Sequence, residues 1–185
     1  MAPVNRSNSS GCRLVPPHEK EKQPRIVSLL SAATEAIYAM GLQHLLVGRS
    51  HECDFPSAVE ALPVVSIARV DVEEGATEID RTVKMKVLGG ESVYGLDEGL
   101  LNRLKPSVII TQDSCRICAV SDEDFSSSKC KLLDAQVLVL HPTRLEEIFS
   151  DIQKVADACG APERGAEVVG RCQDLMEAVG KRVKS

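Results

Sequence analysis

Length, composition and charge limit what this chain of 185 residues can be. It carries 22 basic and 27 acidic residues, and the formal net charge of -5 gives no electrostatic reason to expect nucleic acid as a partner. The length favours one domain with a substantial core. Apolar residues make up 43% of the chain and are almost all aliphatic, a balance that suits buried parallel strands covered by helices.

The amino-terminal segment and the cysteines bear on location. Residues 1–24 contain no apolar run long enough for a signal peptide, so we expect a disordered tail rather than a secretion signal. Seven scattered cysteines favour a reducing compartment. The sequence therefore predicts a cytoplasmic protein, and the Ser-rich tail, free of acid before Glu19, leaves an organellar transit peptide as the alternative. No stretch approaches the length of a membrane-spanning helix, so membrane insertion is not expected.

The body of the chain predicts alternating strands and helices. Expected strands are 25–30, 45–50, 64–66, 107–112 and 136–140. The first strand is followed by a turn at 31–35 and a helical pattern that ends at Gly41. Further helices are expected at 78–88, 97–104 and 145–158. This order predicts an α/β domain with a mostly parallel sheet.

A long helix is expected at 163–184, after Gly160 and Pro162. Its apolar face is formed by Val168, Val169, Cys172, Leu175, Met176 and Val179, and we expect it to pack along the domain. The chain is therefore divided into a tail at 1–24, a domain at 25–160 and a helical segment at 161–185.

Polar residues follow four of the expected strands. In an open parallel sheet, ligands bind outside the carboxyl ends of the strands. The segments 31–35, 51–54, 112–118 and 141–143 would share that edge if the strands are parallel. Turns also need polar residues, so any one segment can be explained without a ligand. The His, Cys, Asp and Gln residues in two of the segments favour a binding site.

Several motifs resemble a known family. They are Ser31-Ala-Ala-Thr-Glu35 after the first strand, Ser50-His-Glu-Cys-Asp-Phe-Pro56, Leu104-Lys-Pro106, and Gln112-Asp-Ser-Cys-Arg-Ile-Cys118. From about residue 25 to the last helix, the chain resembles the amino-terminal lobe of class III, helical-backbone substrate-binding proteins of ABC transporters, in the cobalamin-binding subgroup. The resemblance implies one Rossmann-like lobe followed by the long helix that joins two lobes. The second lobe does not follow in this sequence, so a truncated or degenerate form is expected.

The resemblance and the strand-end positions together predict a ligand site. The expected ligand-binding residues are Ser31, Thr34, Glu35, His51, Glu52, Asp54, Tyr94, Gln112 and Asp113. Cobalamin or a related corrinoid is the implied ligand, held without catalysis, and a metal ion is a second candidate. Because one lobe supplies half a cleft, we expect weak cobalamin binding, with a dimer as one way to rebuild the cleft.

The cysteines suggest a metal site. Cys115 and Cys118 have the spacing of a zinc knuckle or a redox pair, and His51 and Cys53 could add ligands from a neighbouring strand end. His51 is also a candidate axial ligand, because neutral imidazole is a good transition-metal donor. Metal contact, redox chemistry and buried structural thiols all remain open.

Two functions of different classes follow. The first is non-catalytic binding of a corrinoid or metal chelate, and the alternative is a cytosolic metal-binding or thiol-redox protein that uses His51, Cys53, Cys115 and Cys118. No nucleophile elbow, phosphate loop or HExxH motif occurs, so an enzyme is not expected. Glu98 stands one position from an acidic residue that relatives use to dock on transporter permeases, and this offset puts permease docking in doubt.

Overall fold

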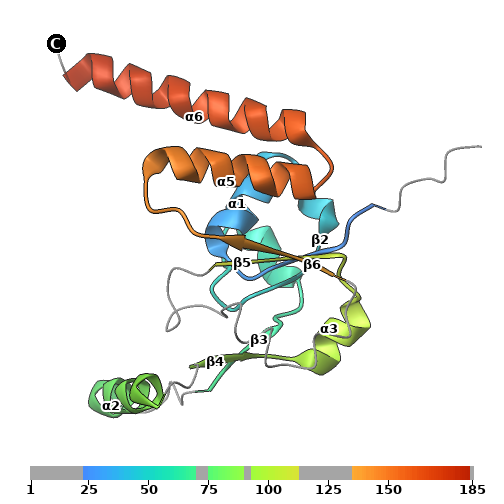
Figure 1. The fold of residues 1–185 in the computed structure, drawn as a ribbon, viewed down its shortest axis with the longest axis vertical. Coiled ribbons are helices and arrows are strands. Elements are labelled where there is room, and N and C mark those ends of the chain that lie inside the picture. Colours follow the sequence, from blue (N-terminus) through green and yellow to red (C-terminus); the bar gives the residue numbers. More distant parts are fainter. Residues whose placement is uncertain (1–22, 70–74, 90–92, 113–134, 184–185) are drawn as a thin grey trace, which may run out of the picture.

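A parallel sheet forms the centre of the molecule. The computed structural model describes residues 23–69, 75–89, 93–112 and 135–183. Four strands, β1 (Ile26–Ser28), β2 (Leu46–Arg49), β5 (Val108–Gln112) and β6 (Gln136–Leu140), pair in the order β2-β1-β5-β6. Every pairing in this sheet is parallel (Figure 1). The predicted α/β class and the parallel pairing of β1 with β5 are confirmed.

The sequence of β5 explains its central place in the sheet. Its residues Val108 to Thr111 are all buried, because both faces of the strand are covered. Ile110 contributes to a core under the helices on one face, and Ile109 to a second core on the other face. β6 begins with exposed residues, as expected of an edge strand.

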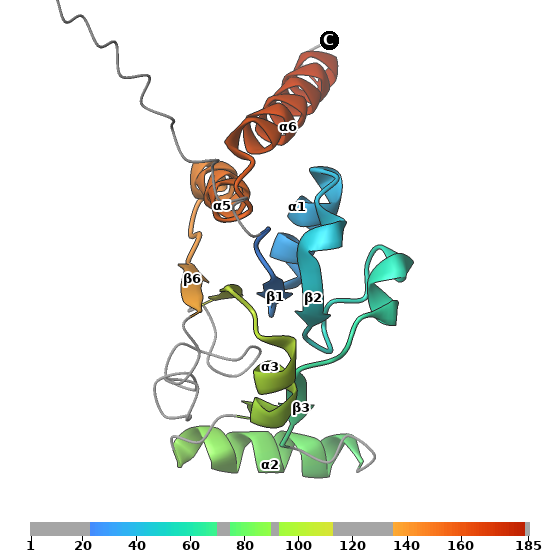
Figure 2. The ribbon, with the colours of Figure 1, turned by 90° about the vertical axis from the view of Figure 1, so that its right-hand side faces the viewer.

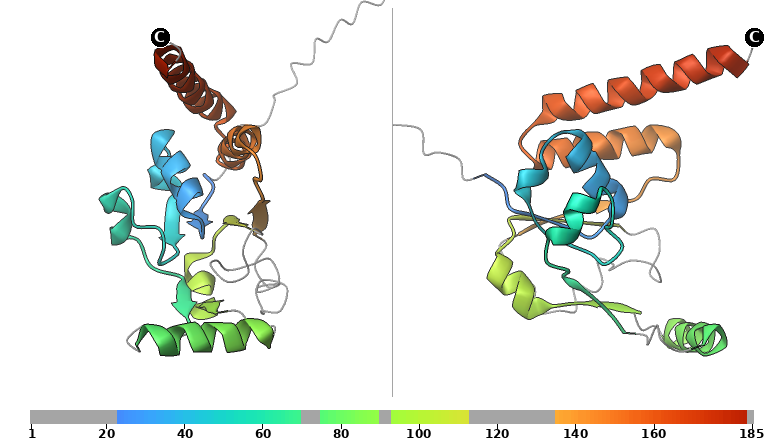
Figure 3. Two further views of the ribbon diagram at one scale, coloured as in Figure 1. Left: turned by 90° about the vertical axis from the view of Figure 1, so that its left-hand side faces the viewer. Right: turned by 180° about the vertical axis from the view of Figure 1, so that it is seen from behind.

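The two faces of the sheet carry different elements. Helices α1 (Ser31–Ala39), α5 (Leu145–Ala158) and α6 (Pro162–Val183) lie on one side (Figures 1 and 2). On the other side lie α3 (Glu98–Leu104) and an antiparallel pair, β3 (Ser66–Ala68) with β4 (Tyr94–Leu96). The remaining elements are α2 (Ala76–Leu88) and two short 3-10 helices at Gln43–Leu45 and Ser57–Ala61 (Figure 3). None of the described helices is long and apolar enough to cross a membrane.

Two local predictions were wrong. The turn expected at 31–35 is the first half of α1, because Ala33 and Thr34 are buried against the sheet and extend the helix back to Ser31. The strand Tyr94–Leu96 was not predicted, since its three residues carry no alternation that distinguishes a strand.

The Leu104-Lys-Pro106 motif ends α3. The Asp97 side chain accepts a hydrogen bond from the backbone N–H of Leu100 and caps the start of the helix. Lys105 adopts a left-handed conformation with φ of 47°, which stops the helix before Pro106. The guanidinium of Arg25 donates to the carbonyl oxygen of Leu104 at 2.7 and 3.0 Å, so the end of α3 is tied to the start of β1.

Helix α6 packs on the domain along its first half only. Gly165 and Val168 are buried, and the contact with α5 is extensive. Beyond Cys172 the apolar face is exposed, with Leu175 67% and Val179 53% accessible to solvent. The expectation that the whole apolar face packs along the domain is therefore met only by the first half of the helix.

Candidate functional site

The loops that follow β1 and β2 meet at the carboxyl edge of the sheet. The hydroxyl of Ser31 donates to the backbone carbonyl of Glu52 at 2.6 Å, and the N–H of Ser50 donates to the carbonyl of Ser28 at 2.9 Å. The register of β1 on β5 pairs Ser28 with Ile110, which places Gln112 two residues further, at the same edge. Residues predicted from three separate strand ends are thus brought to one edge of the sheet.

His51 is held in place by a serine and an aromatic ring. The backbone N–H of His51 donates to the Ser66 hydroxyl at 2.8 Å, and its Nδ1 lies 2.6 Å from the same oxygen. The imidazole and the Tyr94 ring are tilted at 37° with centroids 4.6 Å apart. Nε2 lies 3.1 Å from the Glu52 carboxylate and is covered from solvent. The arrangement fixes the ring and leaves Nε2 next to the carboxylate of Glu52, an exposed side chain.

Thr34 and Cys53 form a buried polar cluster. Both side chains are fully buried, and the Thr34 hydroxyl lies 2.9 Å from that of Ser28 and 3.2 Å from the Cys53 sulfur. The Ser50 hydroxyl lies 3.3 Å from the same sulfur. These contacts join the ends of β1 and β2 to α1. In this structure a ligand or metal could reach either side chain only if the loop opened.

The remaining predicted residues are either at least partly accessible to solvent or outside the described residues. Glu35 and Asp54 are exposed, and Gln112 is half-buried. Asp113, Cys115 and Cys118 lie outside the described residues, so the convergence of His51 and Cys53 with that pair stays a prediction, as does the thiol-redox alternative. Within the described ranges, no group of three His, Cys, Asp or Glu side chains is placed to hold a metal ion.

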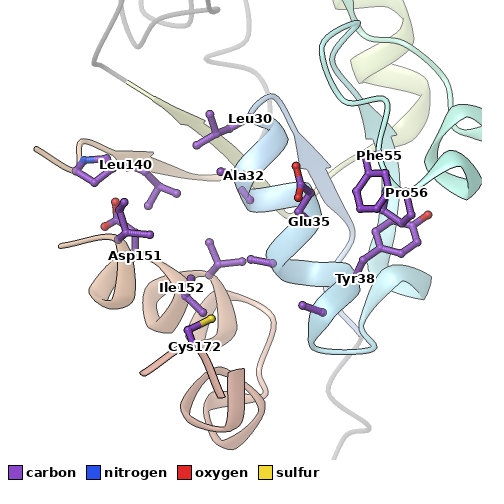
Figure 4. Close-up of a pocket in the computed structure, with 16 residues that line it drawn as sticks. Leu30, Ala32, Glu35, Tyr38, Phe55, Pro56, Leu140, Asp151, Ile152 and Cys172 are labelled. Carbon is purple, nitrogen blue, oxygen red and sulfur yellow. The ribbon is translucent and has the colours of Figure 1, made fainter. Parts of the chain in front are cut away.

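An apolar groove of about 610 Å³ lies beside this edge, along the outer face of α1 (Figure 4). Its floor is α1 itself, and its walls come from α5 on one side and the Phe55–Pro56 segment on the other. The lining residues are Leu30, Ala32, Ala33, Glu35, Ala36, Tyr38, Ala39, Phe55, Pro56, Leu140, Pro142, Ile148, Asp151, Ile152, Val155 and Cys172. Of the predicted ligand residues that the structure describes, only Glu35 lines it. Sequence reasoning missed this groove because its walls come from segments far apart in the chain.

One buried carboxylate belongs to the groove. Asp151 is only 6% accessible, and its Oδ1 accepts a hydrogen bond from the Lys154 ammonium at 2.7 Å. Its Oδ2 is buried, and no described residue forms a hydrogen bond with it. A buried carboxylate oxygen without a partner is costly, so this wall of the groove favours an occupant that donates a hydrogen bond.

Thiol labelling tests the position of Cys53. Burial raises the pKa of the Cys159 thiol to about 11, so at pH 8 it is almost entirely protonated and unreactive. Cys53 is protected by full burial, whereas Cys172 is partly exposed. We expect iodoacetamide at pH 8 to modify Cys172 at least tenfold faster than Cys53 or Cys159, as measured by peptide mass spectrometry. Rapid modification of Cys53 would show that its loop opens readily.

Comparison with known proteins gives one clear result. Neither protein-family models nor curated protein sequences give a match. Solved structures do: the periplasmic heme-binding protein RhuT from Roseiflexus sp. RS-1 in apo form matches with a TM-score of 0.58 and 23% identity, over 85% of this chain and 49% of that one.

Two further structures give similar values. The periplasmic heme-binding protein HutB of Vibrio cholerae has a TM-score of 0.60 and 20% identity, over 86% of this chain and 50% of that one. The periplasmic vitamin B12-binding protein BtuF of Vibrio cholerae has a TM-score of 0.60 and 20% identity, over 88% and 51%. The chain spans about half the length of the solved structures it matches.

These matches correct one prediction and confirm another. The predicted cytoplasmic location is contradicted, because the matched structures RhuT, HutB, BtuF and BhuT are all periplasmic binding proteins. The prediction relied on the composition of residues 1–24 and on the spacing of the cysteines, and not on the fold. The resemblance read from the strand-end motifs is confirmed. In fold, the chain is similar to about half of each of these periplasmic binding-protein structures.

Proposed function

We propose that this chain binds a metal chelate of the tetrapyrrole kind, heme or a corrinoid, without transforming it, and that it does so in the periplasm. The proposal draws support from the fold, since structures of this fold include proteins described as binding heme and vitamin B12. The observation that carries it is the pairing of His51 with Tyr94 at the edge where open α/β sheets bind ligands. Imidazole and phenol oxygen are both side-chain donors to heme iron.

The contacts of His51 support a role as the metal donor. With Glu52 turned away from Nε2, Nδ1 can donate its hydrogen to the Ser66 hydroxyl, and Nε2 then keeps the free lone pair that a metal requires. The Glu52 side chain beside Nε2 is 59% exposed, so its rotation into solvent would take the carboxylate away from the nitrogen at little cost. The hydrogen bond from the His51 backbone to Ser66 would hold the ring during that change.

Affinity should be low for the chain alone. Ligand sites of this size bury most of the ligand surface, and one lobe supplies only part of the enclosure. If two lobes gave about -10 kcal/mol, half of the contacts would leave roughly -5 kcal/mol, which corresponds to a dissociation constant near 0.2 mM. We therefore expect binding in the range of about 0.1 to 1 mM.

Titration with hemin and, separately, hydroxocobalamin tests the proposal. Absorbance should show saturable binding of at least one chelate, with a shift in its visible bands when an imidazole enters the axial position. The His51→Ala variant should lose the band shift and weaken binding at least tenfold. Whether the hemin titration or the hydroxocobalamin titration shows saturable binding distinguishes an iron porphyrin ligand from a corrinoid ligand.

A second histidine provides the matched control. His44 is exposed and precedes β2, at the opposite end of the strand from His51. The His44→Ala variant should bind the chelate as the unaltered chain does, with the same shift of its visible bands. The proposed donor is wrong if both variants keep the spectrum, and the proposed function is wrong if neither chelate binds at 1 mM.

A further inference from the structure

The apolar groove along α1 has the size of a small-molecule site, and we refer to it as the α1 groove. Its volume of about 610 Å³ lies within the range of about 300 to 1,000 Å³ that is typical of ligand pockets. Most of its lining residues are aliphatic or aromatic, and its floor carries the small side chains of Ala32, Ala36 and Ala39 (Figure 4). The proposed chelate site is built on His51 and Tyr94, and neither residue lines the groove. The α1 groove is therefore a second candidate binding site.

The charged side chains on the α1 groove are both acidic. Of the described residues that line it, Glu35 and Asp151 carry a carboxylate, and none is a lysine, an arginine or a histidine. The two carboxylates come from different elements, Glu35 from α1 and Asp151 from α5 (Figure 4). An apolar groove with two carboxylates on its surface favours a positively charged ligand.

Asp151 adds a preference for a hydrogen-bond donor. Its side chain is only 9% exposed, and its Oδ1 is paired with the Lys154 ammonium, which is half exposed. Its Oδ2 is buried, and no described residue donates a hydrogen bond to it. The terminal torsion of an aspartate is soft, so a small rotation presents this oxygen to the groove that Asp151 lines. An N–H group held there would recover part of the cost of burying the carboxylate.

We propose that the α1 groove binds a small organic amine from solution, an apolar molecule that ends in a primary ammonium group. The ammonium lies against Asp151, and the apolar part lies along the alanines of the floor. A primary ammonium has three N–H donors, enough for Oδ2 of Asp151 and for Glu35 or water. The apolar part contributes affinity in proportion to the surface that it buries on the lining residues. This binding site goes beyond chelate binding and does not depend on it.

Isothermal titration calorimetry of the full chain with n-octylamine at pH 7 tests the proposal. The amine is protonated at this pH, and n-octanol and octanoate carry the same alkyl chain with a different end group. We expect octylammonium to bind at least tenfold more tightly than either, because it alone brings a charged donor to the carboxylates. Octyltrimethylammonium, a cation without an N–H group, should bind at least threefold more weakly than octylammonium. The proposal is wrong if octanol binds as tightly as octylammonium, or if octanoate binds best, as the positive end of the α1 dipole would favour.

Asp151→Asn keeps the shape of the side chain and removes its charge. It should weaken octylammonium binding at least tenfold and leave octanol binding within about twofold. Asp174→Asn is the matched control, because Asp174 is exposed and lies on the opposite side of α6 from Cys172, at about 100° per residue. It should bind octylammonium like the unaltered chain. Full affinity in Asp151→Asn, or an equal loss in both variants, would overturn the proposal, since an equal loss indicates attraction to the acidic protein as a whole.

Cys172 reports whether the amine lies in the α1 groove. Cys172 lines the groove and is partly exposed, so saturating octylamine should slow its alkylation by iodoacetamide at least threefold. Ala32→Phe places a ring over the floor from an exposed position, so this variant should fold and should lose both amine binding and the protection of Cys172. His51→Ala should change neither, because His51 does not line the groove. Alkylation of Cys172 at an unchanged rate would place the bound amine elsewhere and overturn the proposal, whether or not a chelate binds.

Discussion

Replacing Ile110 with alanine should lower the free energy of unfolding by about 3 to 4 kcal/mol. Ile110 is fully buried in β5, between two parallel neighbours, and it packs in the core under α1 and α5. Removing three methyl or methylene groups there leaves a cavity that neighbours held by the sheet can fill only in part. Urea unfolding followed by far-ultraviolet circular dichroism measures the change.

Val137 provides the comparison for this prediction. It pairs with Ile109 from the edge strand β6 and is 37% exposed. Val137→Ala should cost less than about 1 kcal/mol, because the site is already in contact with solvent. A loss for Ile110→Ala no greater than that for Val137→Ala would contradict the placement of β5 at the centre of the sheet.

The positions of the strands could be predicted because local patterns agree with the final packing. The apolar runs that form β5 and β6 are short and lie between turn residues, and segments with helical periodicity stand between the strands. The bounds of both strands agree with the expected ones to within one residue. Helix α6 was predicted for the same reason, from a period that continues through its full length. Parallel pairing followed from the alternation of strands and helices.

The candidate site could be predicted only in part. The polar residues at the ends of β1 and β2 meet as expected, because parallel strands place those ends at one edge. The sequence did not indicate that Thr34 and Cys53 face inward, since burial of a polar side chain depends on partners such as Ser28 and Ser50 from other elements. His51 follows β2 and Tyr94 begins β4, so their contact joins residues that are 43 positions apart. No local sequence pattern indicates such a contact.

A close contact between α5 and α6 underlies the last prediction. Gly165 is buried where α6 crosses α5, and a Cβ atom there would lie 2.5 Å from the Cβ of Ala156 and 3.1 Å from the side-chain oxygen of Gln153. The Ala156 side chain cannot rotate away, so the two helix backbones would have to separate. We expect Gly165→Ala to lower the free energy of unfolding by about 1 to 2 kcal/mol, although alanine favours a helix more than glycine does.

Gly170 on the same helix should respond in the opposite direction. A Cβ atom at Gly170 would meet nothing within 4 Å, so only the helix preference of alanine acts there. Gly170→Ala should raise the free energy of unfolding by about 0.5 to 1 kcal/mol in the same urea experiment. If Gly165→Ala also stabilised the protein, α6 would not lie against α5 as described. The exposure of Leu175 and Val179 would then need another explanation, because the α5 contact sets the direction in which α6 leaves the domain.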